Sequence, residues 1–357
     1  MKKREYKNIM VTGGSGFIGS NFIHYFFEKT NSKANIINVD KLTYAGNPNN
    51  LTEIQNKYGN KRYFFYKQDI CDFGGVNKIF QEHEIDCIIH FAAESHVDRS
   101  IFGPKEFIES NIMGTFNLLE VARQNWKDRQ DVLFQHTSTD EVYGSLGDTG
   151  FFFEDTSYDP RSPYSASKAA SDHLVSAYYH TYGLPVTISN CTNNYGAYQF
   201  PEKLIPLMIM NMMEKKDLPV YGDGKNIRDW LFVEDHCSGI WAIVTAGRYG
   251  ETYNIGGENE WENIKLIHEM CKIMDERFPE NAPHNKLIVY VKDRPGHDRR
   301  YAINCDKIKN ELGWTQSVDF AAGLRKTVDW YLDNQEWIDN IRSGEYLKWI
   351  EKNYERR

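Results

Sequence analysis

The sequence has few cysteines, no long hydrophobic segment and no block of basic residues. Its six cysteines form no C-x-x-C pair and no metal-type cluster. In a chain of 357 residues this pattern predicts free thiols in a reducing compartment, and hence a cytoplasmic protein. No apolar run approaches the ~20 residues that a membrane-spanning helix needs. The charged start, Met1 to Arg4, precedes an apolar run that is too short for a signal peptide.

The charge balance argues against two classes of partner. The chain has 42 basic and 50 acidic residues, a formal net charge of −8, and a pI of about 5.8. A net-negative chain without a basic block is a poor candidate for binding duplex nucleic acid or an anionic membrane. A small anionic ligand needs only a few local donors and stays possible. The composition is that of an ordinary globular protein, and no internal repeat interrupts it.

Short apolar runs alternate with helical patterns over the first 190 residues. The patterns predict strands at 9–12, 36–40, 63–69, 87–92, 132–137 and 186–190, and helices at 17–29, 76–84 and 106–125. Strands that alternate with helices indicate βαβ units and a parallel sheet covered on both faces. We therefore expect an α/β protein with a Rossmann-type, doubly wound parallel sheet.

The alternation ends near Asn190, and prolines, loops and a Met-rich helix at about 203–214 follow. We expect residues 1–192 together with about 229–257 to form a nucleotide-binding domain. Residues 193–228 and 258–319 are expected to form a smaller, mixed lobe that binds substrate. The segment 320–357 is expected to be a helical C-terminal tail.

A glycine motif follows the first predicted strand and opens a helix. Gly13, Gly16 and Gly19 form G-x-x-G-x-x-G, in which glycine permits a tight turn and close approach of the backbone to a pyrophosphate. Asp40 ends the next strand, about 20 residues beyond the last glycine. A carboxylate there can accept both ribose hydroxyls and repels a 2′-phosphate, so the motif favours NAD over NADP.

Two further strand ends are expected to line the same site, because open α/β sheets bind ligands at that edge. Asp69 and Ile70 would meet the adenine, with Asp69 accepting from its amino group. The small residues in the segment Phe91 to Ser95 would let it pass close to the pyrophosphate and the nicotinamide ribose. Simple loop packing is the alternative for both segments.

Tyr164 and Lys168 lie four residues apart after Pro163, which places them on one face of a predicted helix. A phenol with a pKa near 10 is a poor base at neutral pH. A nearby lysine ammonium and a nicotinamide cation would favour the phenolate. A lone Y-x-x-x-K is common by chance, and the dinucleotide motif upstream is what gives this one weight.

Several longer motifs complete the pattern: S-T-D-E-V-Y-G at Ser138, A-A-E-S-H-V-D-R-S at Ala92, N-N-Y-G at Asn193, F-P-E-K-L-I-P at Phe200 and D-R-P-G-H-D-R-R-Y at Asp293. With the glycine motif and the Tyr/Lys pair, they resemble the extended short-chain dehydrogenase/reductase family. Within that family they are most similar to the dTDP-glucose 4,6-dehydratases. The resemblance extends from about Lys7 to Asn334, nearly the whole chain.

The residues after the fifth strand agree with this resemblance. An epimerase that oxidises and reduces one carbon needs only a hydroxyl residue beside the tyrosine, whereas here Asp140 and Glu141 follow Thr139. Loss of water across two carbons needs a base for a proton α to a carbonyl and an acid for the leaving hydroxyl. The spacing cannot assign the two roles, and both acids could instead be solvated turn residues. The resemblance implies that Glu141 is the base and Asp140 the acid.

The resemblance also implies the reaction. Tyr164 takes the proton of the sugar 4-hydroxyl while NAD takes hydride from C4, Lys168 holds the phenolate and the nicotinamide ribose, and Thr139 binds the 4-oxygen. Water is then eliminated across C5 and C6, and hydride returns to C6. The expected product is dTDP-4-keto-6-deoxyglucose, as used in dTDP-rhamnose biosynthesis, and no metal is expected.

The remaining contacts are also those that the resemblance implies. The residues expected at the cofactor are Gly13, Gly16, Phe17, Ile18, Gly19, Asp40, Lys41, Leu42, Thr43, Asp69, Ile70, Phe91, Ala92, Ala93, Ser95, Ser110, Tyr164, Lys168 and Asn194. Those expected at the substrate are Ser95, Thr139, Asn193, Lys203, Leu204, Pro219, Tyr221, Arg228, Asn263, Asp293, Arg294 and His297. Guanidinium groups suit a diphosphate, and the ring of Tyr221 could stack on a base.

Relatives pair subunits through helices at about 106–125 and 164–182, so we expect a homodimer. Three other functions stay open at this point. The chain could be a 4,6-dehydratase of another nucleotide sugar, a 4-epimerase, or a protein that senses NAD without turnover. A sensor needs none of the five candidate catalytic residues, which are Thr139, Asp140, Glu141, Tyr164 and Lys168.

Overall fold

A computed structural model gives the fold and describes residues 3–293 and 298–342. Seven parallel strands form the central sheet in the order β10-β6-β5-β4-β1-β2-β3. They are β1 Asn8–Thr12, β2 Asn35–Asp40, β3 Tyr63–Lys67, β4 Cys87–His90, β5 Leu133–Thr139, β6 Val186–Cys191 and β10 Thr252–Ile255. The predicted doubly wound α/β class is therefore confirmed.

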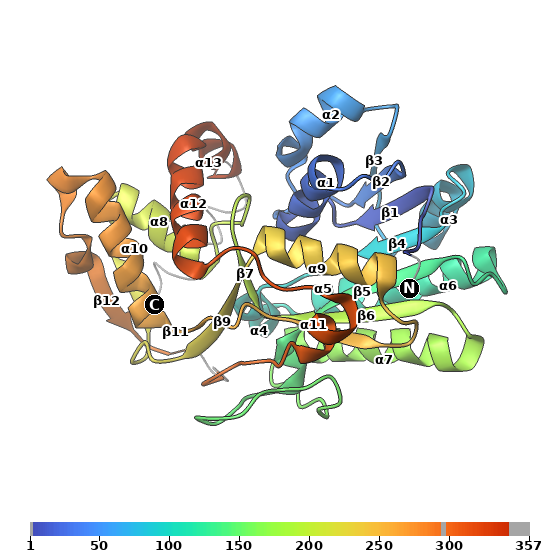
Figure 1. Cartoon of the computed structure of the whole chain (residues 1–357). Coiled ribbons are helices and arrows are strands. Elements are labelled where there is room, and N and C mark those ends of the chain that lie inside the picture. Colours follow the sequence, from blue (N-terminus) through green and yellow to red (C-terminus); the bar gives the residue numbers. More distant parts are fainter. Residues whose placement is uncertain (1–2, 294–297, 343–357) are drawn as a thin grey trace.

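Helices cover both faces of this sheet (Figure 1). On one face, α1 Phe17–Lys29 and α9 Val233–Ala246 pack through residues such as Phe22 and Ile240. On the other face, α3 Phe73–Glu82, α6 Gly114–Trp126 and α7 Pro163–Tyr182 contribute to a second cluster. The central strands β4, β5 and β6 are buried along their whole length. Polar residues such as Gln135 and His136 of β5 are therefore buried within the sheet, together with the apolar ones.

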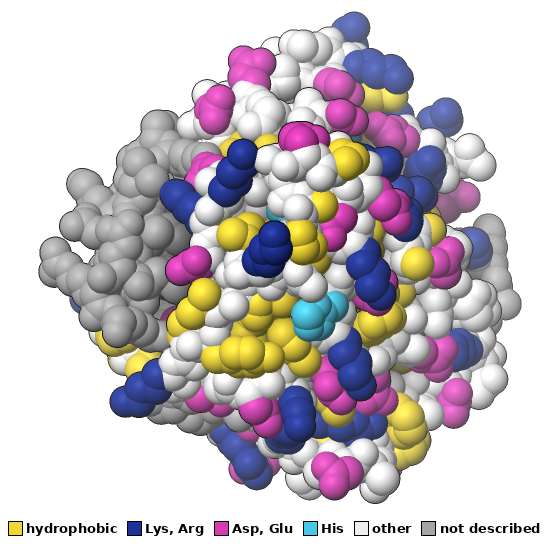
Figure 2. All heavy atoms as spheres, turned by 90° about the vertical axis from the view of Figure 1, so that its left-hand side faces the viewer, with side chains coloured by type: hydrophobic (Ala, Val, Ile, Leu, Met, Phe, Trp, Pro, Cys, Tyr) yellow, Lys and Arg dark blue, Asp and Glu magenta, His cyan; other side chains and the backbone are white. Residues whose placement is uncertain are grey.

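A smaller lobe lies beside the carboxyl ends of these strands (Figure 1). Its core contains the Met-rich helix α8 Leu204–Met213 and the helices α10 Asn263–Arg277 and α12 Phe320–Asp333. Two small sheets belong to it, β11-β9-β7 and β12-β8. Their strands are β7 Asn193–Tyr195, β8 Leu218–Tyr221, β9 Ile227–Phe232, β11 Glu260–Glu262 and β12 Ile288–Val291. Acidic and basic side chains are interspersed over the described part of the lobe face in Figure 2.

The connecting elements are short. They comprise η1 Pro48–Leu51, α2 Thr52–Tyr58, α4 Val97–Phe102, α5 Pro104–Phe107, η2 Ile108–Met113, η3 Asp140–Tyr143, η4 Pro279–Asn281, η5 His284–Leu287, α11 Asp306–Leu312 and α13 Gln335–Arg342. No helix in the two described ranges is both long and apolar enough to cross a membrane. All six cysteines are free thiols.

Two local expectations need correction. The continuous helix predicted at 106–125 is interrupted, because α5 passes through a π-helical turn, η2, before α6 begins. Ser138 and Thr139 were expected after the fifth strand, but they are the last residues of β5 and pair with Asn190 and Cys191 of β6. The polar side chains of Ser138 and Thr139 did not indicate a buried strand. In the structure both residues are nevertheless buried at the edge of the sheet.

The segment after the first six strands returns to the large sheet. Helix α9 packs on α1, and β10 pairs with β6 at the edge of the sheet. Strand β9, which precedes α9, pairs instead with β7 and β11 in the lobe. The boundaries proposed for the two domains and the tail stay predictions.

Candidate active site

The glycine turn after β1 brings two backbone segments unusually close together. Gly13 has a φ of +69°, and a Cβ atom on it would lie 2.7 Å from the backbone of Ala92. Gly16 precedes α1 and provides no side-chain cap for the helix. The amides of the first helical turn therefore point towards the cavity without an internal partner, as a pyrophosphate site requires.

Asp40 ends β2 beside this turn and is largely buried. Its Oδ2 accepts a hydrogen bond of 2.9 Å from the Ser15 amide, and its Oδ1 accepts one of 2.8 Å from the Leu42 amide. Burial raises the pKa of this carboxyl, while the two amides act in the opposite direction. The contacts fix the carboxylate at the wall of the cavity, where a ribose would lie.

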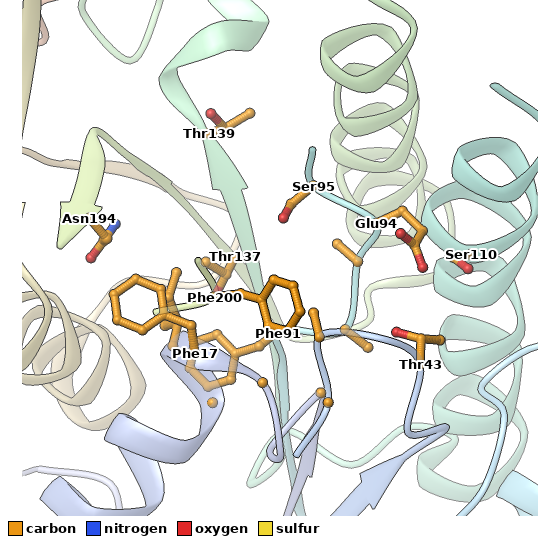
Figure 3. A pocket seen from close by; sticks show the side chains of 18 of the residues that line it. Phe17, Thr43, Phe91, Glu94, Ser95, Ser110, Thr137, Thr139, Asn194 and Phe200 are labelled. Atoms are coloured by element: carbon orange, nitrogen blue, oxygen red, sulfur yellow. The ribbon is translucent and has the colours of Figure 1, made fainter. Parts of the chain in front are cut away.

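One continuous cavity runs along the carboxyl edge of the sheet. Most of the predicted site residues line it: Gly13, Gly16, Phe17, Ile18, Gly19, Asp40, Lys41, Thr43, Asp69, Ile70, Phe91, Ala92, Ala93, Ser95, Ser110, Thr139, Asp140, Glu141, Tyr164, Lys168, Asn193, Asn194 and Lys203. Figure 3 shows Thr43 and Ser110 on one side of the view and Asn194 on the other, with Thr139 at the end of β5. The fold thus gathers the nucleotide motifs and the catalytic candidates into one space.

Helix α7 places Tyr164 and Lys168. It begins with a capping box in which Ser162 and Ser165 bond each other's backbone amides, and Pro163 occupies the first turn. These features fix where the helix starts and therefore which face it presents. Both Tyr164 and Lys168 are buried on the face that lines the cavity.

Lys168 donates a hydrogen bond of 2.8 Å from Nζ to the backbone oxygen of Thr137 on β5. Burial lowers the pKa of its ammonium to about 8. The pKa of Tyr164 moves upward, because burial and the nearby Glu141 both disfavour the phenolate. A hydrogen bond with Thr139 acts in the opposite direction. The protein alone therefore keeps the phenol protonated, and a cationic ligand beside it is needed to make it a base.

Asp140 and Glu141 begin the 3-10 turn η3 directly after β5. Asp140 is almost fully buried, and its Oδ1 is 3.4 Å from the Thr139 hydroxyl, while Glu141 is only partly buried. Burial raises the pKa of Asp140 well above its usual range, and the negative charges of Glu141 and Asp229 add to the effect. The surroundings of Asp140 therefore favour its protonated form.

The lobe contributes Lys203 and the asparagines of β7. Lys203 reaches back to the nucleotide half, where its Nζ donates to the backbone oxygen of Ser95 at 3.0 Å. The amide of Asn194 is buried, and its Oδ1 has no hydrogen-bond partner among the described residues. Such an unsatisfied acceptor at a cavity wall is suited to a ligand donor.

The other predicted contacts lie away from this cavity or outside the described residues. Leu42 lines an adjoining hollow. Leu204, Pro219, Tyr221, Arg228, Asn263 and Asp293 line neither cavity, although all lie in the lobe. Arg294 and His297 lie outside the described residues. The roles assigned to these residues stay predictions.

Two of the predicted contact residues, Arg228 and Asp69, have informative surroundings. The guanidinium of Arg228 donates to the backbone oxygens of Ile227 and Asp298 and stacks on the ring of Tyr301 at 4.4 Å. Asp69, predicted to meet an adenine amino group, is 2.7 Å from the ammonium of Lys41. Asp69 therefore already has a cationic partner at the site.

Further residues line the cavity that the sequence did not single out: Val39, Ala45, Gly46, Gln68, Glu94, Thr137, Ser138, Cys191, Thr192, Gln199, Phe200 and Glu202. Glu202 is the most unusual, since it is buried and its Oε1 accepts from the Tyr44 hydroxyl at 2.7 Å. Burial raises its pKa to about 7. Its place next to Lys203 in F-P-E-K-L-I-P was a signal that could have pointed to it.

The described residues contain no group of three or more side chains suited to a metal ion. A dinucleotide-type glycine turn, a ribose-facing acid and a Tyr/Lys pair on one sheet edge define an enzyme of the short-chain dehydrogenase/reductase type. The acids Asp140 and Glu141 line the same cavity and add to these residues.

Comparison with known proteins makes the assignment more specific. The family model for GDP-mannose 4,6 dehydratase matches residues 10–327. A dTDP-glucose 4,6-dehydratase of Escherichia coli is 53% identical over 363 residues, which cover 98% of this chain and 99% of that protein. The chain therefore belongs to the nucleotide-sugar 4,6-dehydratase family, and within it to the dTDP-glucose 4,6-dehydratases.

Solved structures agree. The Bacillus anthracis dTDP-glucose 4,6-dehydratase in complex with NAD is 46% identical, with a TM-score of 0.84 over 94% of this chain and 99% of that one. A UDP-glucose 4-epimerase of Thermotoga maritima is only 28% identical, yet its TM-score is 0.80 over 92% and 99% of the two chains. The fold is thus shared with epimerases, and the chemistry depends on the site.

Proposed function

We propose that this chain uses NAD to convert dTDP-glucose to dTDP-4-keto-6-deoxyglucose. The steps are oxidation at C4, elimination of water across C5 and C6, and reduction at C6. The observation that carries the proposal is the acid pair at the end of β5, which lies in one cavity with Tyr164 and Lys168. The substrate is the one that the names of the most similar relatives state.

The described residues fit NAD. Gly13 packs directly on the backbone of Ala92, whereas a Cβ atom on Gly16 would meet only the Gly13 carbonyl, so the space beside Gly16 could take a pyrophosphate. Asp40 is held at the cavity wall, where it could accept the ribose hydroxyls. A 2′-phosphate at that position would meet the Asp40 carboxylate, which favours NAD over NADP. When bound, NAD accepts a hydride from C4 of the sugar and supplies one to C6.

Three residues act at C4. Tyr164 takes the proton of the 4-hydroxyl, Lys168 stabilises the phenolate by its positive charge, and Thr139 donates a hydrogen bond to the 4-oxygen. All three line the same cavity. Burial and Glu141 raise the pKa of Tyr164, and the positive charge of a bound nicotinamide ring would act in the opposite direction. The phenol is therefore activated only in the loaded site.

The acid pair completes the dehydration. The 4-ketone makes the C5 proton acidic, and Glu141 removes it as a base. Asp140, whose pKa burial and the charge of Glu141 raise, gives a proton to the leaving 6-hydroxyl, so that one water departs. When hydride returns to C6, Glu141 gives its proton back to C5, and the proton that Tyr164 took from the 4-hydroxyl balances the one that Asp140 lost with the water.

The lobe holds the nucleoside diphosphate. We assign the diphosphate to Arg228 and Arg294, the base to Pro219 and Tyr221, and the neighbouring contacts to Ser95, Asn193, Lys203, Leu204, Asn263, Asp293 and His297. Tyr221 ends β8, and Asn263 begins α10 with a buried Oδ1 that lacks a partner among the described residues. Both residues belong to the lobe.

We further propose that the chain acts as a cytoplasmic homodimer. Support comes from six free cysteines and from exposed apolar side chains that gather on neighbouring elements. These are Ile101 and Phe102 on α4, Ile108 and Met113 on η2, Phe116 on α6 and Tyr182 on α7. Apolar groups clustered on a surface are typical of a protein contact. The proposed division into a nucleotide-binding domain, a substrate lobe and a tail rests on the sheet memberships described above.

The test is to incubate purified protein with dTDP-glucose and with UDP-glucose separately, with and without added NAD. Product mass and proton NMR are then recorded. The proposal predicts loss of one water and a new C6 methyl signal from dTDP-glucose. An unchanged mass with inversion at C4 would identify an epimerase. Activity on UDP-glucose but not on dTDP-glucose would change the assigned substrate to UDP-glucose. No product from either sugar nucleotide would favour an NAD sensor.

A further inference from the structure

The ammonium of Lys168 is buried among groups that carry no charge of their own. Its Nζ donates to the Thr137 carbonyl at 2.8 Å and is 3.4 Å from Nε2 of His136. A carbonyl and a neutral imidazole satisfy hydrogen bonds, but they do not balance a positive charge. A buried ammonium without a counter-charge tends to lose its proton. The position of the balancing negative charge therefore matters for catalysis.

Asp172 lies one helical turn beyond Lys168 on α7 and is 2% exposed. Its Oδ2 accepts hydrogen bonds from the Ser138 hydroxyl at 2.7 Å and the Tyr158 hydroxyl at 3.0 Å. Its Oδ1 is 3.1 Å from Nε2 of His136, the same atom that Lys168 approaches. The imidazole thus lies between the ammonium and the carboxylate. Asp172 does not line the cavity, so it is not placed to touch substrate or cofactor.

We propose that Asp172 is the buried counter-charge of Lys168 and a positioning residue for catalysis, acting through Lys168 and with His136 between them. This inference rests on the role proposed above for Lys168, and it adds a residue that has no contact with the reacting atoms. The i, i+4 spacing on α7 places the two charges on one helix face, directed at the same histidine of β5.

The other titratable groups around Lys168 do not supply the charge. Burial raises the pKa of the Cys191 thiol on β6 to about 12, so it is neutral at physiological pH. His136 on β5 and His90 on β4 are neutral as well, because burial lowers the pKa of both imidazoles. Burial and the charge of Glu141 raise the pKa of Asp140, directly after β5, and so disfavour its charged form.

Asp172 itself is ionised at neutral pH. Burial raises the pKa of its carboxyl to about 6, and the charge of Lys168 and the hydroxyls of Ser138 and Tyr158 limit the rise. His173 on the same helix also acts to lower the pKa of Asp172. The ring of Tyr143 packs against that of Tyr158, with the centroids 5.3 Å apart. Asp172 in turn raises the pKa of Lys168 against the effect of burial.

The consequence is a shift in the pH dependence of catalysis. If Asp172 becomes neutral, the Lys168 ammonium loses its partner and releases its proton at lower pH. The alkaline limb of kcat should then move down by about 1 to 3 pH units, the range for loss of a nearby opposite charge. The KM for the sugar nucleotide should stay near the parent value, because no substrate contact is removed.

The experiment measures kcat and KM for dTDP-glucose from pH 6 to pH 9.5 for the parent and for Asp172→Asn, with NAD supplied. The expected result is a lower kcat at pH 8, recovery towards the parent at pH 6, and an alkaline limb at lower pH. A uniform fall in kcat with an unmoved limb would show a merely structural role and overturn the proposal. A parent without activity would instead refute the proposed function.

Three further variants make the result specific. Asp172→Glu keeps the negative charge, and the alkaline limb of its kcat should lie at the same pH as in the parent. Tyr158→Phe removes one hydrogen bond to Asp172 but not its charge, and should not lower the alkaline limb. If the Asn variant does not fold, the smaller neutral Asp172→Ser is expected to show the same downward shift. A parent-like limb in a folded Asp172→Ser would overturn the proposal.

Discussion

Asp140 and Glu141 are neighbours in sequence but differ in their surroundings. Asp140 is 2% exposed, whereas Glu141 is only partly buried. Because two adjacent carboxylates repel, the one with less access to water keeps its proton. This difference supports the proposed roles of Asp140 as the acid and Glu141 as the base, which the spacing of the two residues could not distinguish.

Asp140→Asn should therefore lower product formation by about 10²- to 10⁴-fold, the usual range for loss of a general acid. The variant should still exchange the substrate C5 proton with solvent deuterium, because Glu141 is intact. Proton NMR in D₂O measures the exchange. Glu141→Gln is the matched control and should abolish it. If the Asn variant loses exchange and the Gln variant keeps it, the two roles are reversed.

Glu202 should make the stability of the folded chain depend on pH. Its pKa is about 7 in the folded chain against 4.5 for an ordinary glutamate, so the folded state holds a proton that the unfolded state releases. The free energy of unfolding should then fall as pH rises from about 4.5 to 7 and level off above. Glu202→Gln cannot titrate. Its stability relative to the parent should rise by about 3 kcal/mol over that range.

Urea unfolding of the parent and Glu202→Gln at pH 5, 6, 7 and 8 measures this difference. A difference that does not change with pH would mean that Glu202 is ionised in the folded chain.

The residues to which we assign the chemistry share one cavity, and the sequence indicated them because each lies in a local pattern. Gly13 to Gly19, Thr139 to Glu141 and the Tyr164/Lys168 pair are such patterns. The protonation states of Asp140, Asp172 and Glu202 could not be predicted. They depend on how other segments of the chain bury each carboxyl group. Tyr44 bonds Glu202 in this way, and Tyr158 bonds Asp172.

Among the elements, α7 and the segment from 104 to 126 show the limits of periodicity. The start of α7 was expected after Pro163, a local signal, and the helix begins at Pro163 with Ser162 as its N-cap. The π-helical turn η2 inside the other segment has no such signal. It directs the Asn111 side chain to the Glu94 backbone at 2.8 and 3.0 Å and to the Ser167 hydroxyl at 2.8 Å. Only tertiary contacts of this kind favour the turn.

The C-terminal segment packs on the nucleotide half through α13. The Trp337 indole donates to Oδ1 of Asn50 at 2.7 Å, and Nδ2 of Asn50 donates to the backbone oxygen of Ser15 in the glycine turn. From the sequence, Trp337 and Trp349 were each open to packing on the domain or on a neighbouring chain; Trp337 packs on the domain, and Trp349 lies outside the described residues.

Trp337→Phe should destabilise the chain by about 1–3 kcal/mol, because the buried Asn50 acceptor loses its partner. Trp330→Phe is the matched control. It removes an indole from the same aromatic cluster without breaking the contact with Asn50. Urea unfolding monitored by circular dichroism compares the two. Equal losses would mean that the hydrogen bond to Asn50 contributes nothing beyond packing.

At the scale of the whole molecule, two apolar clusters lie on opposite faces of the large sheet and a third fills the lobe. The repeating strand–helix pattern predicted the first two. The lobe was harder to predict, because its strands pair across long separations in sequence. Strand β8 pairs with β12, and β9 pairs with both β7 and β11.

The proposed homodimer predicts twice the chain mass of 41.7 kDa in light scattering. Phe102→Glu combined with Met113→Glu should give a monomer, since both side chains are exposed on the proposed contact surface. Tyr290→Glu, an equally exposed aromatic residue on β12 of the lobe, is the control and should leave the dimer intact. A parent that is monomeric at every concentration would contradict the homodimer.

The most direct test of the whole account uses dTDP-glucose that carries deuterium at C4. The account requires that the hydride removed from C4 returns to C6 of the same sugar after water has left. Mass spectrometry and NMR of the product should therefore show loss of one water and retention of the deuterium in the new C6 methyl group. Deuterium that stays at C4 with no loss of water, or that is absent from the dehydrated product, would contradict it.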